Sequence, residues 1–172
     1  MLLGITPDHA EPNYGWIDAG DGFGVEGAAL FAVRRFWEKP GPGAPHTLLR
    51  EGCLWNSFVF IARLSTLILA IMRAAPALSS TFASLRSSLG MAGEDEAVRR
   101  LYENLPPVDF SRQVLEKCPE GLAVLPVCGV DWSDLGEPQR VLEIVRRTDA
   151  KPRWTRSLDP DQGTEIPKEE HA

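Results

Sequence analysis

The chain is long enough to build one domain and too acidic to be a general binder of nucleic acid. It has 172 residues and a formal net charge of -6 at pH 7, which argues against unspecific binding to nucleic acid or to anionic membrane surfaces. Its three cysteines, Cys53, Cys118 and Cys128, are widely spaced and form neither a disulfide framework nor a zinc motif. With no signal peptide and no apolar run of membrane-spanning length apparent, we expect a soluble, cytoplasmic protein.

Short strands are predicted over the first sixty residues. Apolar runs predict strands at 1–5, 14–17, 29–37 and 54–61. A glycine-rich turn is expected over 20–24 after the second strand, and a short helix over 46–50.

Helices are predicted over most of the remaining chain. Leu64, Leu67, Ile68 and Ile71 recur at helical spacing and predict a helix that ends before Pro76 and buries this stripe as core. Further helices are expected at 94–105, at 111–118 (beginning at Asp109 or Ser111) and at 137–147, with a strand over 122–128. We expect a partial domain over 1–148 and a polar, flexible tail over 149–172. Strands interleaved with helices indicate an α/β fold.

Five short strings of residues follow one another along the chain. They are Gly4-Ile-Thr-Pro with Glu11-Pro-Asn-Tyr-Gly-Trp-Ile17, Phe36-Trp-Glu-Lys-Pro40, Leu54-Trp-Asn-Ser57, Asp109-Phe-Ser111, and Leu125-Pro-Val with Asp131-Trp-Ser-Asp-Leu-Gly136. In this order they resemble strings of the sugar-phosphate nucleotidyltransferase family, and among its members most closely those of the mannose-1-phosphate guanylyltransferases. Any one of them alone is weak evidence, whereas five in order cover most of residues 3–147.

The resemblance implies a fold and a reaction. The chain is similar to the carboxyl-terminal part of a Rossmann-like nucleotidyltransferase domain, an α/β fold with a mixed, mostly parallel sheet flanked by helices. The reaction implied is nucleotidyl transfer from GTP, or another nucleoside triphosphate, to mannose-1-phosphate or another sugar-1-phosphate. It gives a nucleotide sugar, GDP-mannose, and pyrophosphate, with Mg²⁺ as cofactor. In such a reaction the protein mainly aligns two anions and neutralises their charge.

Carried over residue by residue, the family strings assign roles in this sequence. Substrate binding falls to Tyr14, Gly15, Glu38, Lys39, Trp55, Asn56 and Ser57, and catalysis to Lys39 and Asp134, with Asp134 also the metal ligand. Lys39 offers a phosphate a compact positive charge. Glu38 can accept hydrogen bonds from sugar hydroxyls, and Asn56 can both donate and accept. Asp134 supplies the hard oxygen that Mg²⁺ prefers.

Plain structural roles compete with these assignments. Glu38 and Lys39 could be a solvated pair at a strand end, and Asn56 could bridge backbone within a sheet. Trp55 suits core packing as well as it suits a platform for the sugar. Asp134 could cap the helix that begins near residue 137, a role compatible with metal binding.

The sequence also departs from the family. The family's glycine-rich loop, of the type G-G-x-G-T/S-R-L-x-P, does not occur in it, nor does the first metal-binding aspartate. Phe58 replaces the glycine that usually follows the Asn-Ser pair. We therefore expect an unpaired apolar sheet edge and a chain that is inactive, or nearly so, on its own.

Three origins fit these departures: a truncated gene product, a remnant, or a chain that pairs with another protein covering the edge. The alternative function is a non-catalytic module that binds a sugar phosphate or nucleotide sugar, or regulates a full-length relative by associating with it.

Overall fold

The computed structural model describes residues 1–25, 28–150 and 152. Its contacts divide the chain into two compact units, Met1–Val130 and Asp131–Ala172. All five described strands lie in the first unit, and helix α5 (Pro138–Arg147) lies in the second. The domain boundary expected at residue 148 stays a prediction. Most of the tail expected over 149–172 lies outside the described residues.

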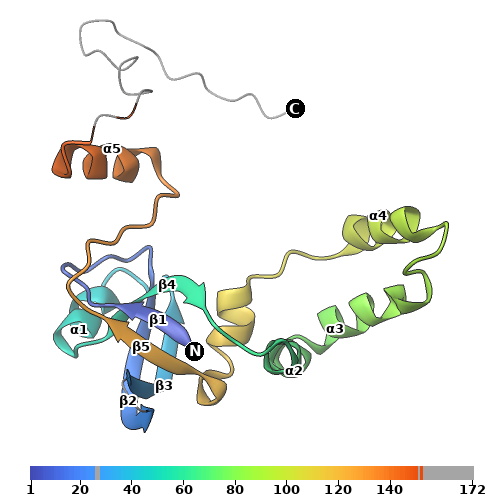
Figure 1. Cartoon of the computed structure of the whole chain (residues 1–172), viewed down its shortest axis with the longest axis horizontal. Coiled ribbons are helices and arrows are strands. Elements are labelled where there is room, and N and C mark those ends of the chain that lie inside the picture. The colour runs from blue at the N-terminus through green and yellow to red at the C-terminus, as the bar shows by residue number, and fades with distance from the viewer. Residues whose placement is uncertain (26–27, 151, 153–172) are drawn as a thin grey trace, which may run out of the picture. The chain divides into compact units, whose positions relative to one another are not determined.

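The five strands form a small closed barrel in the first unit (Figure 1). They are β1 (Leu2–Ile5), β2 (Gly15–Val25), β3 (Ala28–Glu38), β4 (Leu54–Phe60) and β5 (Ala123–Val127), in the order β1-β4-β2-β3-β5. The pairing of β1 with β5 is parallel, and the other four pairings are antiparallel. The α/β class and the mixed sheet are confirmed. The described sheet is nevertheless mostly antiparallel, since only the β1–β5 pairing is parallel.

Closure of the barrel contradicts the expected sheet edge. Each described strand has two neighbours, since β1 lies between β4 and β5 and so joins the two ends of the sheet. The open apolar edge predicted from the sequence is therefore wrong for these strands, and the partner chain expected to cover it stays a prediction.

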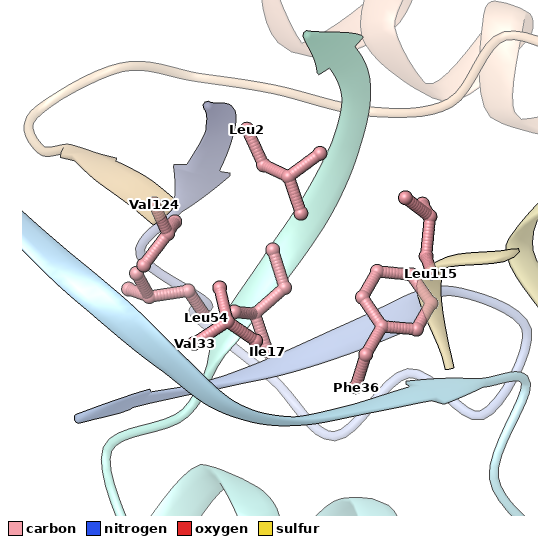
Figure 2. Packing of buried hydrophobic residues seen from close by; sticks show 7 residues of the cluster. All are labelled: Leu2, Ile17, Val33, Phe36, Leu54, Leu115 and Val124. Carbon is pink, nitrogen blue, oxygen red and sulfur yellow. The ribbon is translucent and has the colours of Figure 1, made fainter. Parts of the chain in front are cut away.

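A hydrophobic cluster fills the barrel. Figure 2 shows its seven buried side chains converging from all five strands and from the turn that carries Leu115: Leu2, Ile17, Val33, Phe36, Leu54, Leu115 and Val124. β1 passes close to this cluster at Gly4, where an added Cβ would lie 2.7 Å from Val124 Cγ2 and 2.8 Å from Leu54 Cδ1. Glycine at this position allows the approach.

Helical segments connect the strands of the first unit. They are α1 (Ala44–Arg50), α2 (Leu64–Ala74), α3 (Pro76–Ala83) followed by the 3₁₀ turn η1 (Ser84–Ser87), α4 (Glu94–Asn104), the π-helical turn η2 (Ser111–Leu115) and the 3₁₀ turn η3 (Pro119–Gly121).

One sequence prediction about a turn is wrong, and one about a helix end is confirmed. Residues 20–24 lie within β2, where Gly22 and Gly24 pair with Phe31 and Ala29 of β3, so the strand continues through the glycines. The helix predicted to end before Pro76 does so, since α2 ends at Ala74. Pro76 begins the next helix, α3, because proline fits the first turn of a helix, where its missing N–H is not needed.

Helices α2 and α3 leave much of their apolar surface exposed. Leu64 is 72% exposed and Ile68 is 47% exposed, so the prediction that this stripe is buried core is wrong for these two residues. Among the described residues no single helix has the length and apolar character to span a bilayer. The bent pair Leu64–Ala74 and Pro76–Ser87 satisfies that criterion only when its two helices are taken together.

Candidate functional site

Three predicted site residues meet where β2, β3 and β4 lie side by side. Gly15 is the register partner of Glu38 in the β2–β3 pair. A Cβ added to Gly15 would lie 3.1 Å from Glu38 Oε2 and 3.1 Å from Asn56 Cβ. The missing side chain of Gly15 therefore allows the Glu38 carboxylate and the Asn56 side chain to approach its backbone closely. Any other residue at position 15 would crowd them.

The carboxylate of Glu38 is half-buried among charged and polar neighbours. Burial raises the pKa of the Glu38 carboxyl above its ordinary value, and the negative charge of Asp109 adds to the rise. A side-chain hydrogen bond with Ser111 and the positive charges of Lys39 and Arg112 lower this pKa in turn. Burial is thus the largest of several opposing effects on the pKa of the Glu38 carboxyl.

Lys39 follows directly at the end of β3. Its side chain is exposed and its backbone has a φ of 51°. For a residue other than glycine, such a left-handed conformation costs about 1–2 kcal/mol and is often retained where it positions a functional group. This left-handed angle occurs at the residue that directly follows Glu38 and the end of β3.

Asn56 and Ser57 support an irregular stretch of β4. The register between β1 and β4 shifts between Leu2 and Gly4. Opposite this shift, the Ser57 hydroxyl donates to the Leu3 carbonyl at 2.7 Å, and Asn56 Oδ1 accepts from the Phe58 backbone N–H at 3.2 Å. The Asn56 side chain therefore does bridge backbone within the sheet, which was the structural alternative to ligand binding. The predicted ligand role is compatible with it, because the amide nitrogen carries two donors.

Tyr14, Trp16 and Trp55 form an aromatic cluster behind the site. Trp55 makes edge contacts with Tyr14 and Trp16 at centroid distances of 5.1 Å and 6.1 Å, and Trp16 Nε1 donates to the Glu11 carbonyl at 2.9 Å. Trp16 is 0% exposed and Trp55 is 2% exposed. This burial favours the packing alternative for Trp55 over a sugar platform.

Asp134 lies in the second unit, on the segment before α5. Its Oδ1 accepts from the Gly136 backbone N–H at 2.9 Å, and its Oδ2 lies 3.4 Å from an Arg140 guanidinium nitrogen. Glu137 occupies the N-cap position of α5, so the structure does not support Asp134 as the cap of this helix. Its carboxylate instead closes a short turn.

A metal site made by the protein alone is not found in residues 1–25, 28–150 and 152, where no three His, Cys, Asp or Glu side chains cluster. Mg²⁺ is commonly held by one or two carboxylates together with substrate phosphates and waters. The half-exposed carboxylate of Asp134 fits that donor chemistry, so its role as a single protein ligand stays a prediction.

Ser111 and Arg112 are the site neighbours that motif reasoning did not select. Ser111 is 3% exposed, and Arg112 pairs with Asp109 at 3.7 Å. The signal was present in the sequence, since Asp109-Phe-Ser111 belongs to the strings that resemble the family. The position of this string in the sequence did not show that the turn η2 would lie against the end of β3.

Comparison with known proteins places this architecture in a family. The profile of the nucleotidyl transferase family matches residues 1–151. The chain is 27% identical over 150 residues to mannose-1-phosphate guanylyltransferase 2 of Escherichia coli O157:H7, covering 84% of this chain and 31% of that protein. It is 28% identical over 149 residues to the xanthan biosynthesis protein XanB of Xanthomonas campestris pv. campestris (strain B100), covering 84% and 30%. The chain thus spans about a third of the length of these curated relatives.

Solved structures agree with this assignment. The crystal structure of mannose-1-phosphate geranyltransferase from Thermus thermophilus superposes with a TM-score of 0.63 at 26% identity, covering 88% of this chain and 40% of that chain. Mannose-6-phosphate isomerase from Helicobacter pylori superposes with a TM-score of 0.58 at 19% identity, covering 77% and 51%, and this second likeness shows the fold alone. Since the family profile covers most of the sequence, the chain belongs to the nucleotidyl transferase family.

Proposed function

We propose that the chain supplies the sugar-phosphate-binding part of a nucleotidyltransferase that acts on mannose-1-phosphate. The observation that carries the proposal is the meeting of Gly15, Glu38 and Asn56 where β2, β3 and β4 adjoin, with Lys39 following Glu38 in the chain. The names of the guanylyltransferase relatives support the choice of sugar. A carboxylate and an amide suit sugar hydroxyls, and a lysine suits the phosphate.

In the proposed reaction an oxygen of the sugar phosphate attacks the α-phosphorus of GTP, and pyrophosphate leaves. Glu38 accepts hydrogen bonds from sugar hydroxyls, Asn56 donates to the sugar, and Lys39 balances the phosphate charge. Mg²⁺, when bound, would neutralise phosphate oxygens, and Asp134 is the residue proposed to hold it. These residues orient and neutralise, which is the protein's main contribution to such a transfer.

Residues 1–172 on their own are proposed to bind the sugar phosphate without completing the transfer. Two observations support this: the chain spans about a third of its curated relatives, and its sequence contains no G-G-x-G-T/S-R-L string. Backbone N–H groups of such a loop are a common cradle for a triphosphate.

Titration calorimetry with mannose-1-phosphate tests the proposal. We expect measurable binding to the whole chain and a loss of roughly tenfold or more in affinity for Lys39→Ala, because a charge-assisted contact to phosphate is removed. Lys117→Ala, which changes an exposed lysine elsewhere, is the matched control and should bind like the wild type. Absence of binding to the folded wild-type chain would overturn the proposal. Pyrophosphate release at an ordinary enzymatic rate would overturn only the claim that the chain is inactive alone.

A further inference from the structure

We propose that the first unit docks on the surface of an anionic lipid bilayer through the end of β4, helices α2 and α3, and the turn η1. Residues 58–86 form this docking face. The face contains none of the residues proposed to hold the sugar phosphate or Mg²⁺, so its function is separate from theirs. Three features of the segment point to lipid: its charge, its exposed apolar side chains and its unpaired arginines.

The charge of this segment is opposite to that of the whole chain. Between Glu51 and Glu94 the sequence contains no aspartate or glutamate, and its charged residues there are Arg63, Arg73 and Arg86. The whole chain has a formal net charge of -6, but exposed charges more than a Debye length apart, about 8 Å at physiological ionic strength, are largely screened. The local charge therefore decides what this face attracts, and it favours an anionic partner.

Large apolar side chains are exposed over the same segment. Leu64, Ile68 and Met72 follow one another at a spacing of four residues, which places them on one side of α2. The exposed set of the docking face consists of Phe58, Val59, Phe60, Ile61, Leu64, Ile68, Leu69, Met72 and Phe82. A single exposed apolar residue is ordinary, whereas a group of them gathered in one segment marks an interaction surface.

A hollow between α2 and α3 joins the apolar and the cationic parts of the docking face. It has a volume of about 520 Å³. Ile68 and Met72 line it from α2, Phe82 lines it from α3, and Arg86 lines it from the turn η1. Arginine carries its charge at the end of an apolar stem and binds phosphate oxygens in a planar, bidentate geometry. Such a hollow suits a lipid, whose acyl chains are apolar and whose head group carries a phosphate.

The three arginines of the docking face have no partners within the part of the chain that the structure describes. Their side chains are exposed and make no ion pair or side-chain hydrogen bond with the described residues. Helix α4 differs in this respect, because its Arg100 pairs with Glu96 at 2.6 Å. The arginines of the docking face are thus left to meet negative charges of another molecule.

An anionic bilayer fits this combination better than a second copy of the chain does. Two copies that met through this face would bring arginines close to arginines, with no carboxylate in either segment to neutralise them. A bilayer surface receives both groups at once, because interfacial helices bury their apolar side about 5–10 Å deep while their arginines stay among anionic head groups. The axes of α2 and of the helix that begins at Pro76 are bent by 117°, and two such axes can both lie along one surface.

Co-sedimentation with lipid vesicles tests the proposal on the whole chain. It should bind vesicles of phosphatidylcholine mixed with phosphatidylglycerol at low salt. Binding should be roughly tenfold weaker, or more, for vesicles of phosphatidylcholine alone and for the anionic vesicles at high salt. The triple variant Arg63→Gln/Arg73→Gln/Arg86→Gln should lose roughly tenfold or more in affinity for the anionic vesicles, because the attraction to head groups is removed. Its folding is checked by circular dichroism, and a spin without vesicles corrects for aggregation.

Two further variants separate the apolar contribution from a general effect of charge. Leu64→Ser/Ile68→Ser keeps all arginines and should also weaken binding to the anionic vesicles, because less apolar surface enters the bilayer. Arg99→Gln/Arg100→Gln/Arg147→Gln removes the same number of positive charges outside the docking face. It is the matched control for the triple variant and should bind like the wild type.

The outcomes are decisive for the docking face and leave the sugar-phosphate site to its own test. Equal binding to both kinds of vesicle, or an equal loss in the two triple variants, would overturn the proposal. A folded chain that binds neither kind of vesicle would overturn it as well. If that chain forms dimers in analytical ultracentrifugation, and Leu64→Ser/Ile68→Ser abolishes them, a second copy covers the face instead of lipid.

Discussion

Three residues other than glycine hold left-handed backbone in the described part of the chain; one of them directly follows β3 and another lies within β4. Lys39 has a φ of 51° and Phe58 a φ of 60°. A left-handed backbone angle at a residue that carries a side chain lowers the stability of the fold by about 1–2 kcal/mol. At Lys39 the strain accompanies a predicted phosphate contact. Phe58 occupies the position where the family that the sequence resembles usually has glycine, and the backbone angle explains why glycine suits it.

Phe58→Gly is therefore expected to stabilise the chain. Relief of the left-handed strain outweighs the extra entropy of glycine in the unfolded state, which leaves a net gain of about 0.5–1 kcal/mol. The side chain is 60% exposed, so little packing is lost. The midpoint and slope of urea unfolding measure the change.

Val59→Gly is the matched control for this substitution. Val59 is 50% exposed and is not among the residues with positive φ. Glycine there should destabilise the chain by at least about 0.5–1 kcal/mol, since the entropic cost of glycine applies in full and half of the valine side chain loses its packing. A loss of stability in both variants would show that backbone strain at Phe58 is not the controlling term.

At the residue scale, the sequence predicted which residues belong to the site better than it predicted the contacts that these residues make. Gly15, Glu38 and Asn56 came from short strings, and the structure brings them together. Ser111 was not selected, because its place depends on how a turn distant in sequence packs on β3. The burial of Trp55 was equally out of reach, since an aromatic residue at a strand start reads the same whether it packs or faces a ligand.

Among the elements, the strands were easier to predict than their pairing. Apolar runs located all five described strands to within a few residues, with β2 longer than expected. Nothing in a local pattern states that β1 pairs with β5, which lies at the other end of the first unit. That pairing closes the barrel and removes the expected edge. Local periodicity also predicted the α2 helix but placed its apolar stripe in a core, because periodicity does not state what covers a face.

The short strand β1 depends on Gly4 for its place in the barrel. Gly4→Ala is expected to destabilise the chain by about 1–3 kcal/mol, because the added methyl group would overlap Val124 and Leu54 in the core. Thermal or urea unfolding measures the loss. The double variant Gly4→Ala/Val124→Ala should lose less than the sum of its two single variants, since the second change makes room for the first.

Gly41→Ala is the control for this prediction. Nothing lies within 4 Å of a Cβ added at Gly41, and its backbone is not among those with positive φ. This substitution should change the free energy of unfolding by less than about 0.5 kcal/mol. Equal effects of the two alanine substitutions would show that close packing at β1 does not limit stability.

At the scale of the whole molecule, the family roles are divided between the two units. Every residue predicted on the sugar side, from Tyr14 to Ser57, lies in Met1–Val130, together with Ser111. The predicted metal ligand Asp134 lies in the unit that begins at Asp131. The two proposed tasks, holding the sugar phosphate and holding Mg²⁺, should therefore be separable by shortening the chain.

A chain shortened to residues 1–130 is expected to keep a cooperative unfolding transition and to bind mannose-1-phosphate within about threefold of the whole chain. It retains the barrel and its core, and it should lose any increase in affinity that Mg²⁺ gives the whole chain, because Asp134 is gone. A chain shortened to residues 1–121 is the matched control. It lacks β5, whose Val124 is 0% exposed and whose pairings join β1 to β3, so it should fail to fold. Circular dichroism with calorimetry measures both. If residues 1–130 fold but bind no sugar phosphate, the site needs the second unit, and the separation of the two tasks is wrong.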